Sequence, residues 1–144
     1  MPRVNNEVII HAPVEKVFHY VSQPANLQQI WPSLVEVTNE ELLPNGGYRY
    51  RWKYKMSGIQ FSGFGEAIDF KRNVLLISRN VGAIESVVTF AFMSKDIQTK
   101  VTLGIDYRVP LLLLGKFTET IILKMNEKEA ELILDNLRII FEKS

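Results

Sequence analysis

Residues 48–56 alternate without exception between apolar and basic side chains, and this pattern constrains the fold more than any other feature of the chain. The apolar positions are Tyr48, Tyr50, Trp52, Tyr54 and Met56, and the basic positions between them are Arg49, Arg51, Lys53 and Lys55. Successive side chains of a β-strand point to opposite faces of the sheet. The pattern therefore predicts a strand with one buried aromatic face and one solvated basic face.

Other β-like segments surround this strand in the sequence. They cover residues 4–11, 34–43, 59–70, 74–80, 84–93 and 97–109. Short turns join the strands from residue 34 onward, which favours an antiparallel meander over βαβ units. Gly63 and Gly65 lie inside one of these strands, where glycine usually marks a bulge or a sharp bend. We therefore expect a strongly curved sheet with a bulge or a sharp bend at these glycines.

Helical patterns occupy two places in the chain. Two short helices are expected after the first strand, one beginning at Pro13 and one ending before Pro32. A long helix is expected from about residue 116 to 143. It would carry a main apolar stripe and, at its start, a second stripe formed by Leu114, Phe117, Ile121 and Met125. Two interpretations of the second stripe stay open: burial under sheet and loops, or the lining of a pocket entrance or dimer contact.

Composition excludes several classes of function. A length of 144 residues suits one domain spanning residues 1–144. The absence of cysteine excludes disulfides, thiol catalysis and thiolate metal sites. Seventeen basic and sixteen acidic residues give a net charge of +1, so no overall field attracts nucleic acid. No apolar run approaches the roughly 20 residues of a membrane span, and the N-terminal residues do not resemble a secretory signal, so we expect a cytoplasmic protein.

No catalytic or metal-binding motif is present. His11 and His19 have no acidic neighbours at metal-ligand spacing, and nucleophile-elbow, HExxH and phosphate-loop patterns do not occur. We therefore predict no catalytic residue, no metal and no cofactor. The charged residues of the strands are expected to face outward, although an inward Glu66 or Asp106 beside Tyr107 or Arg108 could form an acid/base pair.

Three segments carry a family resemblance. Residues 8–18 (VIIHAPVEKVF), residues 24–32 with their Trp31-Pro32 ending, and residues 137–142 resemble the START-like superfamily, also called the polyketide cyclase/dehydrase, Bet v 1-like or SRPBCC group. The resemblance covers essentially the whole chain. It implies an α+β helix-grip fold: a curved antiparallel sheet of about seven strands around a long C-terminal helix, with two short helices after the first strand.

The superfamily includes lipid and hormone carriers, aromatase/cyclases, quinone-binding proteins and chaperone activators, so the resemblance implies a cavity and leaves the reaction open. The aromatic face of residues 48–56 is then either plain core or pocket wall. The residues expected to contact a ligand are Trp31, Tyr48, Tyr50, Trp52, Tyr54, Phe61, Phe90, Tyr107, Phe117 and Ile121.

These observations predict a protein that binds, transports or senses a small hydrophobic ligand between the sheet and the C-terminal helix. Neither nucleic acid nor a membrane span is expected, and a weak homodimer is compatible with the apolar start of the helix. A first alternative is a polyketide-type cyclase or dehydratase, which needs a buried ionisable or hydroxyl group in the pocket. A second alternative is a protein-interaction module with a filled cavity.

Overall fold

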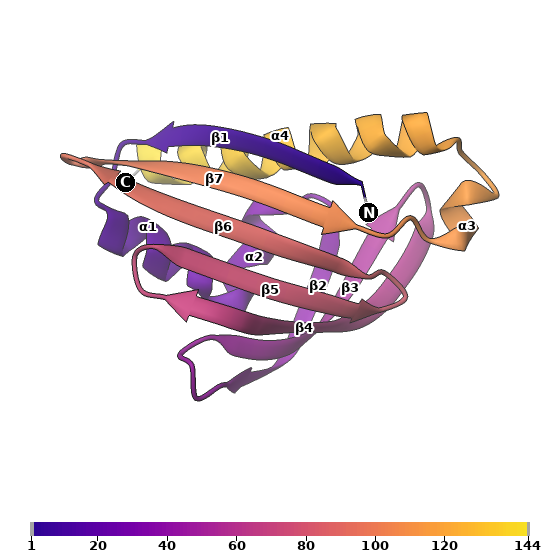
Figure 1. Ribbon diagram of the computed structural model, residues 1–144, viewed down its shortest axis with the longest axis horizontal. Coiled ribbons are helices and arrows are strands. Elements are labelled where there is room, and N and C mark those ends of the chain that lie inside the picture. The colour runs from indigo at the N-terminus through magenta and orange to yellow at the C-terminus, as the bar shows by residue number, and fades with distance from the viewer. Residues whose placement is uncertain (1, 144) are drawn as a thin grey trace.

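Seven β-strands and four helices make up the computed structural model, which describes residues 2–143 (Figure 1). In chain order they are β1 (Arg3–Ile10), α1 (Val14–Ser22), α2 (Pro24–Ile30), β2 (Leu34–Leu42), β3 (Tyr48–Met56), β4 (Ile59–Lys71), β5 (Leu75–Gly82), β6 (Ser86–Lys95), β7 (Gln98–Tyr107), α3 (Leu111–Leu114) and α4 (Glu119–Glu142).

The strands form one antiparallel sheet in the order β1-β7-β6-β5-β4-β3-β2. The short helices α1 and α2 carry the chain from β1 at one edge to β2 at the other. Helix α4 runs alongside β1, and the sheet curves beneath it (Figure 1). The predicted fold class, a curved antiparallel sheet around a long C-terminal helix, is confirmed.

The core lies between the inner face of the sheet and α4. The inward side chains of β7 are buried, as are those on one side of α4, where Ile133 and Leu137 are fully covered. Burial of a large aliphatic side chain contributes about 1.5–3 kcal/mol relative to exposure. Packing of this face therefore holds α4 across the sheet and fixes the height of the space beneath its first half.

The hairpin between β3 and β4 turns at Ser57 and Gly58. Both residues have positive φ, 52° and 78° respectively. Two consecutive residues in this conformation are typical of the type I′ turn, which matches the twist of two antiparallel strands. This hairpin is one of the short turns that the sequence predicts between the strands.

Of the two alternatives for Gly63 and Gly65, the bulge is wrong. Strand β4 pairs with β3 without a register shift there, with Trp52 opposite Gly63 and Tyr50 opposite Gly65, and the irregularity in β4 lies farther on, beside Ala67. A Cβ on Gly63 would lie 2.6 Å from Cζ2 of Trp52, and one on Gly65 would lie 2.6 Å from Cζ of Tyr50. The glycines thus make room for two aromatic rings that lie across β4 on the inner face.

The expectation of one straight C-terminal helix with two apolar stripes is also wrong. Leu114 belongs to the separate short helix α3, and Phe117 lies between the two helices. Helix α4 starts after Thr118, whose side chain accepts a hydrogen bond from the backbone N–H of Ile121 at 3.3 Å. A threonine N-cap satisfies a free N–H of the first turn and so fixes where the helix begins.

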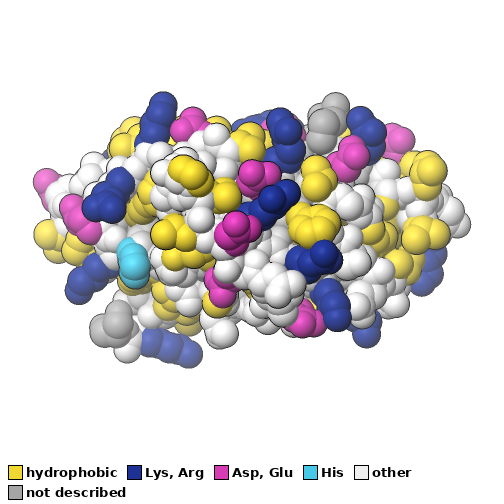
Figure 2. All heavy atoms as spheres, turned by 90° about the horizontal axis from the view of Figure 1, so that it is seen from below, with side chains coloured by type: hydrophobic (Ala, Val, Ile, Leu, Met, Phe, Trp, Pro, Cys, Tyr) yellow, Lys and Arg dark blue, Asp and Glu magenta, His cyan; other side chains and the backbone are white. Residues whose placement is uncertain are grey.

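The basic residues of β3 all lie on the outer, solvated face. Lys53 pairs with Glu36 at 3.2 Å, and the guanidinium of Arg51 lies 4.4 Å from the ring centre of Phe64 on β4. Figure 2 shows basic, acidic and apolar side chains intermixed on the face seen from below the view of Figure 1. Within residues 2–143, no helix is long and apolar enough to cross a bilayer.

Candidate ligand-binding site

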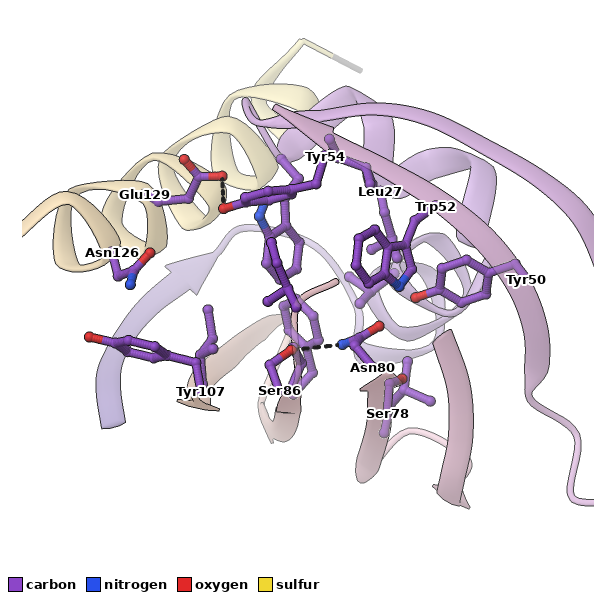
Figure 3. A pocket seen from close by; sticks show the side chains of 18 residues that line it. Leu27, Tyr50, Trp52, Tyr54, Ser78, Asn80, Ser86, Tyr107, Asn126 and Glu129 are labelled. Carbon is purple, nitrogen blue, oxygen red and sulfur yellow. Dashed lines mark hydrogen bonds between the residues drawn. The ribbon is translucent and has the colours of Figure 1, made fainter. Parts of the chain in front are cut away.

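A cavity of about 110 Å³ lies between the inner face of the sheet and the first half of α4. Its walls come from β3, β5, β6 and β7, from α4, and from α2 with the residues that follow it. Figure 3 shows the side chains that converge on it. The sheet curves around this space because the helix-facing positions of β4 are glycine or alanine at three successive inward positions, 63, 65 and 67.

Six aromatic side chains line the cavity, and all six were among the predicted site residues. They are Trp31, Tyr50, Trp52, Tyr54, Phe90 and Tyr107. Three of them come from β3, where the strict alternation directs every second residue inward. The aromatic face of β3 is therefore pocket wall at these three positions and not only packed core.

The structure does not place the other four predicted site residues in the wall of this cavity. Tyr48 lines a neighbouring hollow of about 20 Å³, and Phe61 is packed in the core with 2% of its surface exposed. Phe117 lies before α4 and packs against the core, and Ile121 lies on the first turn of α4 with 45% exposure. The separation of α3 from α4 moves both residues away from the position that a continuous helix would give them.

Polar residues of the wall were not predicted from the sequence. Ser78 and Asn80 on β5, Ser86 on β6 and Asn126 on α4 all line the cavity. The amide of Asn80 donates a hydrogen bond to the hydroxyl of Ser86 at 3.1 Å. The signal was present in β5, where Ser78 and Asn80 continue the inward face of Leu76 at a spacing of two.

Glu129 is the one charged residue that lines the cavity among the described residues, and the sequence pattern does not predict it there. The charged run from Asn126 to Glu129 is typical in sequence of a solvated helix surface, but only Glu127 and Lys128 are exposed. Asn126 and Glu129 are half-buried and face the cavity (Figure 3). Residues three apart share a helix face, and the next positions on that face continue into the buried stripe at Ile133.

Three hydrogen bonds hold the Glu129 carboxylate in place. Its Oε2 accepts from the Ser33 hydroxyl at 2.7 Å, and its Oε1 accepts from the Ser33 backbone N–H at 3.2 Å and from the Tyr54 hydroxyl at 3.1 Å. Burial, together with the negative charge of Glu129, raises the pKa of Tyr54 far above its usual value. The Tyr54 hydroxyl therefore keeps its proton and remains a donor to the carboxylate.

Tyr50, deeper in the cavity wall, is also held in its neutral form. Burial raises the pKa of Tyr50 to about 12. The two tyrosines thus present un-ionised hydroxyl groups at physiological pH, and neither adds negative charge to the cavity.

Two indole N–H groups of the wall are buried without a hydrogen-bond partner, those of Trp31 and Trp52. The Trp31 indole lies close enough to the Tyr54 hydroxyl to oppose the rise of its pKa, but the two groups do not form a hydrogen bond of normal geometry. Trp52 is only 6% exposed. A buried donor left unpaired costs about 1–3 kcal/mol, so an acceptor atom on a ligand would be favoured here.

The remaining candidate groups lie away from the cavity. His11 contacts Gln98 at 2.8 Å and is exposed, and His19 is exposed on α1. Asp106 pairs with Arg3, so the acid/base pair considered for this part of the sheet is not formed in the cavity. Among residues 2–143, no three His, Cys, Asp or Glu side chains are grouped so that they could hold a metal ion.

A curved antiparallel sheet that wraps a long C-terminal helix over an aromatic-lined cavity defines the class of helix-grip proteins. The chain belongs to the family described as polyketide cyclase/dehydrase and lipid transport, whose model matches residues 1–142. The predicted membership of the START-like superfamily is confirmed. No curated protein matches the chain.

Solved structures support the same fold. A START superfamily protein from Mycobacterium smegmatis has a TM-score of 0.82 at 14% identity, with 98% of this chain and 97% of that chain covered. A protein from Thermus thermophilus has a TM-score of 0.77 at 22% identity, with 99% and 98% covered. The Zhui aromatase/cyclase from a Streptomyces species has a TM-score of 0.76 at 17% identity, with 99% and 94% covered. At these identities the likeness shows the fold alone.

Proposed function

We propose that this protein binds one small hydrophobic ligand in the cavity beneath α4. The observation that carries the proposal is an apolar cavity walled by six aromatic side chains and provided with a buried, unpaired indole donor on Trp52. Ligand sites are typically concave, mostly apolar and equipped with a few polar groups that set orientation. Membership of a family of polyketide cyclases and lipid carriers supports the same conclusion.

The size of the cavity limits the ligand. Its volume of about 110 Å³ is somewhat smaller than the ~150 Å³ of an engineered protein cavity that holds benzene. The part of the ligand enclosed in this conformation is therefore about one aromatic ring. Removing about 150 Å² of apolar ring surface from water would contribute about 4 kcal/mol to binding.

A longer ligand requires the wall to move. We expect the connection around α3 to form a gate, because Leu111 and Leu112 are 85% and 67% exposed and Leu113 is the one buried residue of α3. A segment with few buried apolar contacts opens at lower free energy than the sheet does.

Intrinsic fluorescence provides the test, because the chain has two tryptophans and both line the cavity. Native mass spectrometry of the purified protein comes first, followed by titration with toluene and with acetophenone, which adds a carbonyl acceptor. We expect saturable changes in emission and a raised melting temperature. Trp52→Phe should weaken acetophenone binding more than toluene binding, whereas Phe64→Leu on the outer face should change neither. The proposal fails if no ligand co-purifies and neither compound alters emission or stability.

The second candidate function is a polyketide-type cyclase or dehydratase. The observation that favours it is the pair formed by Glu129, an ionisable carboxylate, and Tyr54, a hydroxyl held protonated, at the same end of the cavity. Such a pair can take a proton from a carbon beside a carbonyl and donate a hydrogen bond to the oxygen. This candidate is tested by following the dehydration of a β-hydroxy ketone by NMR. An enzymatic function requires that the protein turns this compound over, and that Glu129→Gln abolishes turnover while the compound still binds.

The interaction-module alternative has less support. Its predicted surface would expose Phe117, Ile121 and Met125 together, but Phe117 and Met125 pack against the core. Its cavity would be filled by side chains, whereas about 110 Å³ remains open.

A further inference from the structure

The cavity has one charged group in its wall. Glu129 is the only ionisable carboxylate among the described lining residues, and none of those residues is a lysine, arginine or histidine. The rest of the wall is aromatic, aliphatic, hydroxyl or amide. The charge of any ligand that enters is therefore selected by a single negative group.

No cationic side chain of the described chain neutralises this carboxylate. Its neighbour Lys128 points to solvent and pairs with Glu131 at 3.7 Å. The three donors to Glu129 are all neutral: the backbone N–H of Ser33, the hydroxyl of Ser33 and the hydroxyl of Tyr54. Neutral donors stabilise a carboxylate only in part, because removing a charge from water costs far more than one hydrogen bond returns. A positive charge nearby would be strongly favoured.

The geometry leaves room for such a charge. A carboxylate has about four acceptor positions, of which three are occupied in Glu129. The Tyr54 hydroxyl donates to Oε1, and Ser33 and the Trp31 indole lie close enough to its oxygen to oppose the rise of the Tyr54 pKa. In Figure 3 these two groups lie at the α4 end of the cavity, and Asn126 lies beside Glu129 on the same helix. The amide oxygen of Asn126 is a further neutral acceptor on the same face of α4.

The aromatic wall favours a cation for a separate reason. The faces of tryptophan and tyrosine rings carry negative electrostatic potential and attract ammonium groups, most strongly where water is excluded. Trp31, Trp52 and Tyr54 supply such rings in the same cavity as the carboxylate. Aromatic rings combined with one carboxylate form the type of site that recognises organic ammonium ions.

We propose that the ligand of this cavity is a hydrophobic amine bound as its ammonium ion, with the ammonium group at Glu129 and Tyr54 and the apolar body against the aromatic wall. This inference rests on the proposed ligand-binding function and adds the chemical class of the ligand. It disfavours carboxylate and phosphate ligands, because the cavity would place their charge beside Glu129 with no cation to offset it.

The test compares three probes of nearly equal shape: benzylamine, benzyl alcohol and benzoate. Affinities are measured by isothermal titration calorimetry and tryptophan fluorescence near neutral pH, where the first is a cation and the last an anion. We expect benzylamine to bind at least about tenfold more tightly than benzyl alcohol, since hydrogen bonds to charged groups exceed neutral ones by about a factor of ten in binding. Benzoate should bind most weakly.

Variants assign the preference to its residue. Glu129→Gln keeps the size of the side chain and can still form hydrogen bonds with Ser33 and Tyr54, so we expect this variant to fold. It should lose the preference for benzylamine and keep its affinity for benzyl alcohol. Glu127→Gln makes the same chemical change on the exposed face of α4 and should leave all three affinities unchanged. Tyr54→Phe keeps the charge of Glu129 and should retain most of the preference.

Each outcome separates this inference from the function on which it rests. Equal binding of benzylamine and benzyl alcohol would overturn the amine inference and leave a neutral-ligand pocket. A preference for benzylamine that survives Glu129→Gln would overturn the placement of the ammonium group at Glu129. Binding of none of the three, together with no response to toluene or acetophenone, would overturn both.

Discussion

Replacing Gly63 by alanine should destabilise the protein, although alanine is ordinarily the better residue in a strand. A Cβ at this position would overlap the carbonyl oxygen of Val81 on β5 and lie 2.6 Å from Cζ2 of Trp52. The carbonyl belongs to the sheet backbone and cannot move without disturbing its ladder. Overpacking of this kind costs about 1–3 kcal/mol, and the backbone contact places this site near the upper end. Alanine also lowers the conformational entropy of the unfolded chain relative to glycine, which stabilises the folded protein by about 0.4–1 kcal/mol.

The net loss is therefore about 2 kcal/mol, and at about 3–4 °C per kcal/mol for a chain of this length the melting temperature should fall by roughly 6–8 °C. Differential scanning calorimetry and urea denaturation measure it. Gly115→Ala is the matched control, because Gly115 has helical φ and ψ of −69° and −15° and a Cβ there would meet no atom nearer than 3.7 Å. A melting temperature for Gly63→Ala equal to or above that of the control would refute the packing argument, and with it the explanation of how the Trp52 ring is accommodated.

Three further predictions concern stability. Burial raises the pKa of Tyr50 from 10.0 to about 12, so as pH rises the unfolded chain loses the Tyr50 proton before the folded chain does. The free energy of unfolding should therefore decline as pH rises from 10.0 towards about 12. Denaturation at stepped pH measures this decline, and Tyr50→Phe should make the decline smaller. Thr99→Val should cost about 1–3 kcal/mol, because the Thr99 hydroxyl is fully buried and donates to the Ala12 carbonyl at 2.8 Å; a urea midpoint equal to that of wild type would contradict this role. Thr118→Ala should lower the free energy of unfolding by about 1 kcal/mol through loss of the α4 N-cap, which calorimetry detects as a lower melting temperature. Thr118→Ser keeps a hydroxyl at the N-cap and should melt close to wild type.

The sequence predicted the parts of the fold that depend on local pattern. The alternation in β3 correctly gave both the strand and the direction of its aromatic residues, because a period of two leaves no freedom once one face is buried. The same reasoning failed at Gly63 and Gly65, since the demand on those residues comes from rings of the neighbouring strand. No pattern within β4 alone reveals what lies opposite it.

The candidate site was predicted in its apolar part and missed in its polar part. Aromatic residues on inward strand positions indicated the wall, but Glu129 lies in a charged run whose neighbours are exposed. Its inward direction follows from the rotation of α4, which is fixed by the buried stripe farther along the helix. The long helix expected from about residue 116 begins only at Glu119, so Phe117 lies before it, and neither Phe117 nor Ile121 lines the cavity as the sequence predicts.

Three features of the cavity wall each lower the stability of the fold, and they specify complementary parts of one molecule. Open volume in a core costs about 24 cal/mol per Å³, or about 2.6 kcal/mol for a cavity of about 110 Å³. The indole N–H of Trp52 lacks an acceptor, and the carboxylate of Glu129 lacks a cation. A ring, an acceptor atom and an ammonium group would relieve them together, so the destabilising features of the wall, more than its aromatic area, describe the ligand.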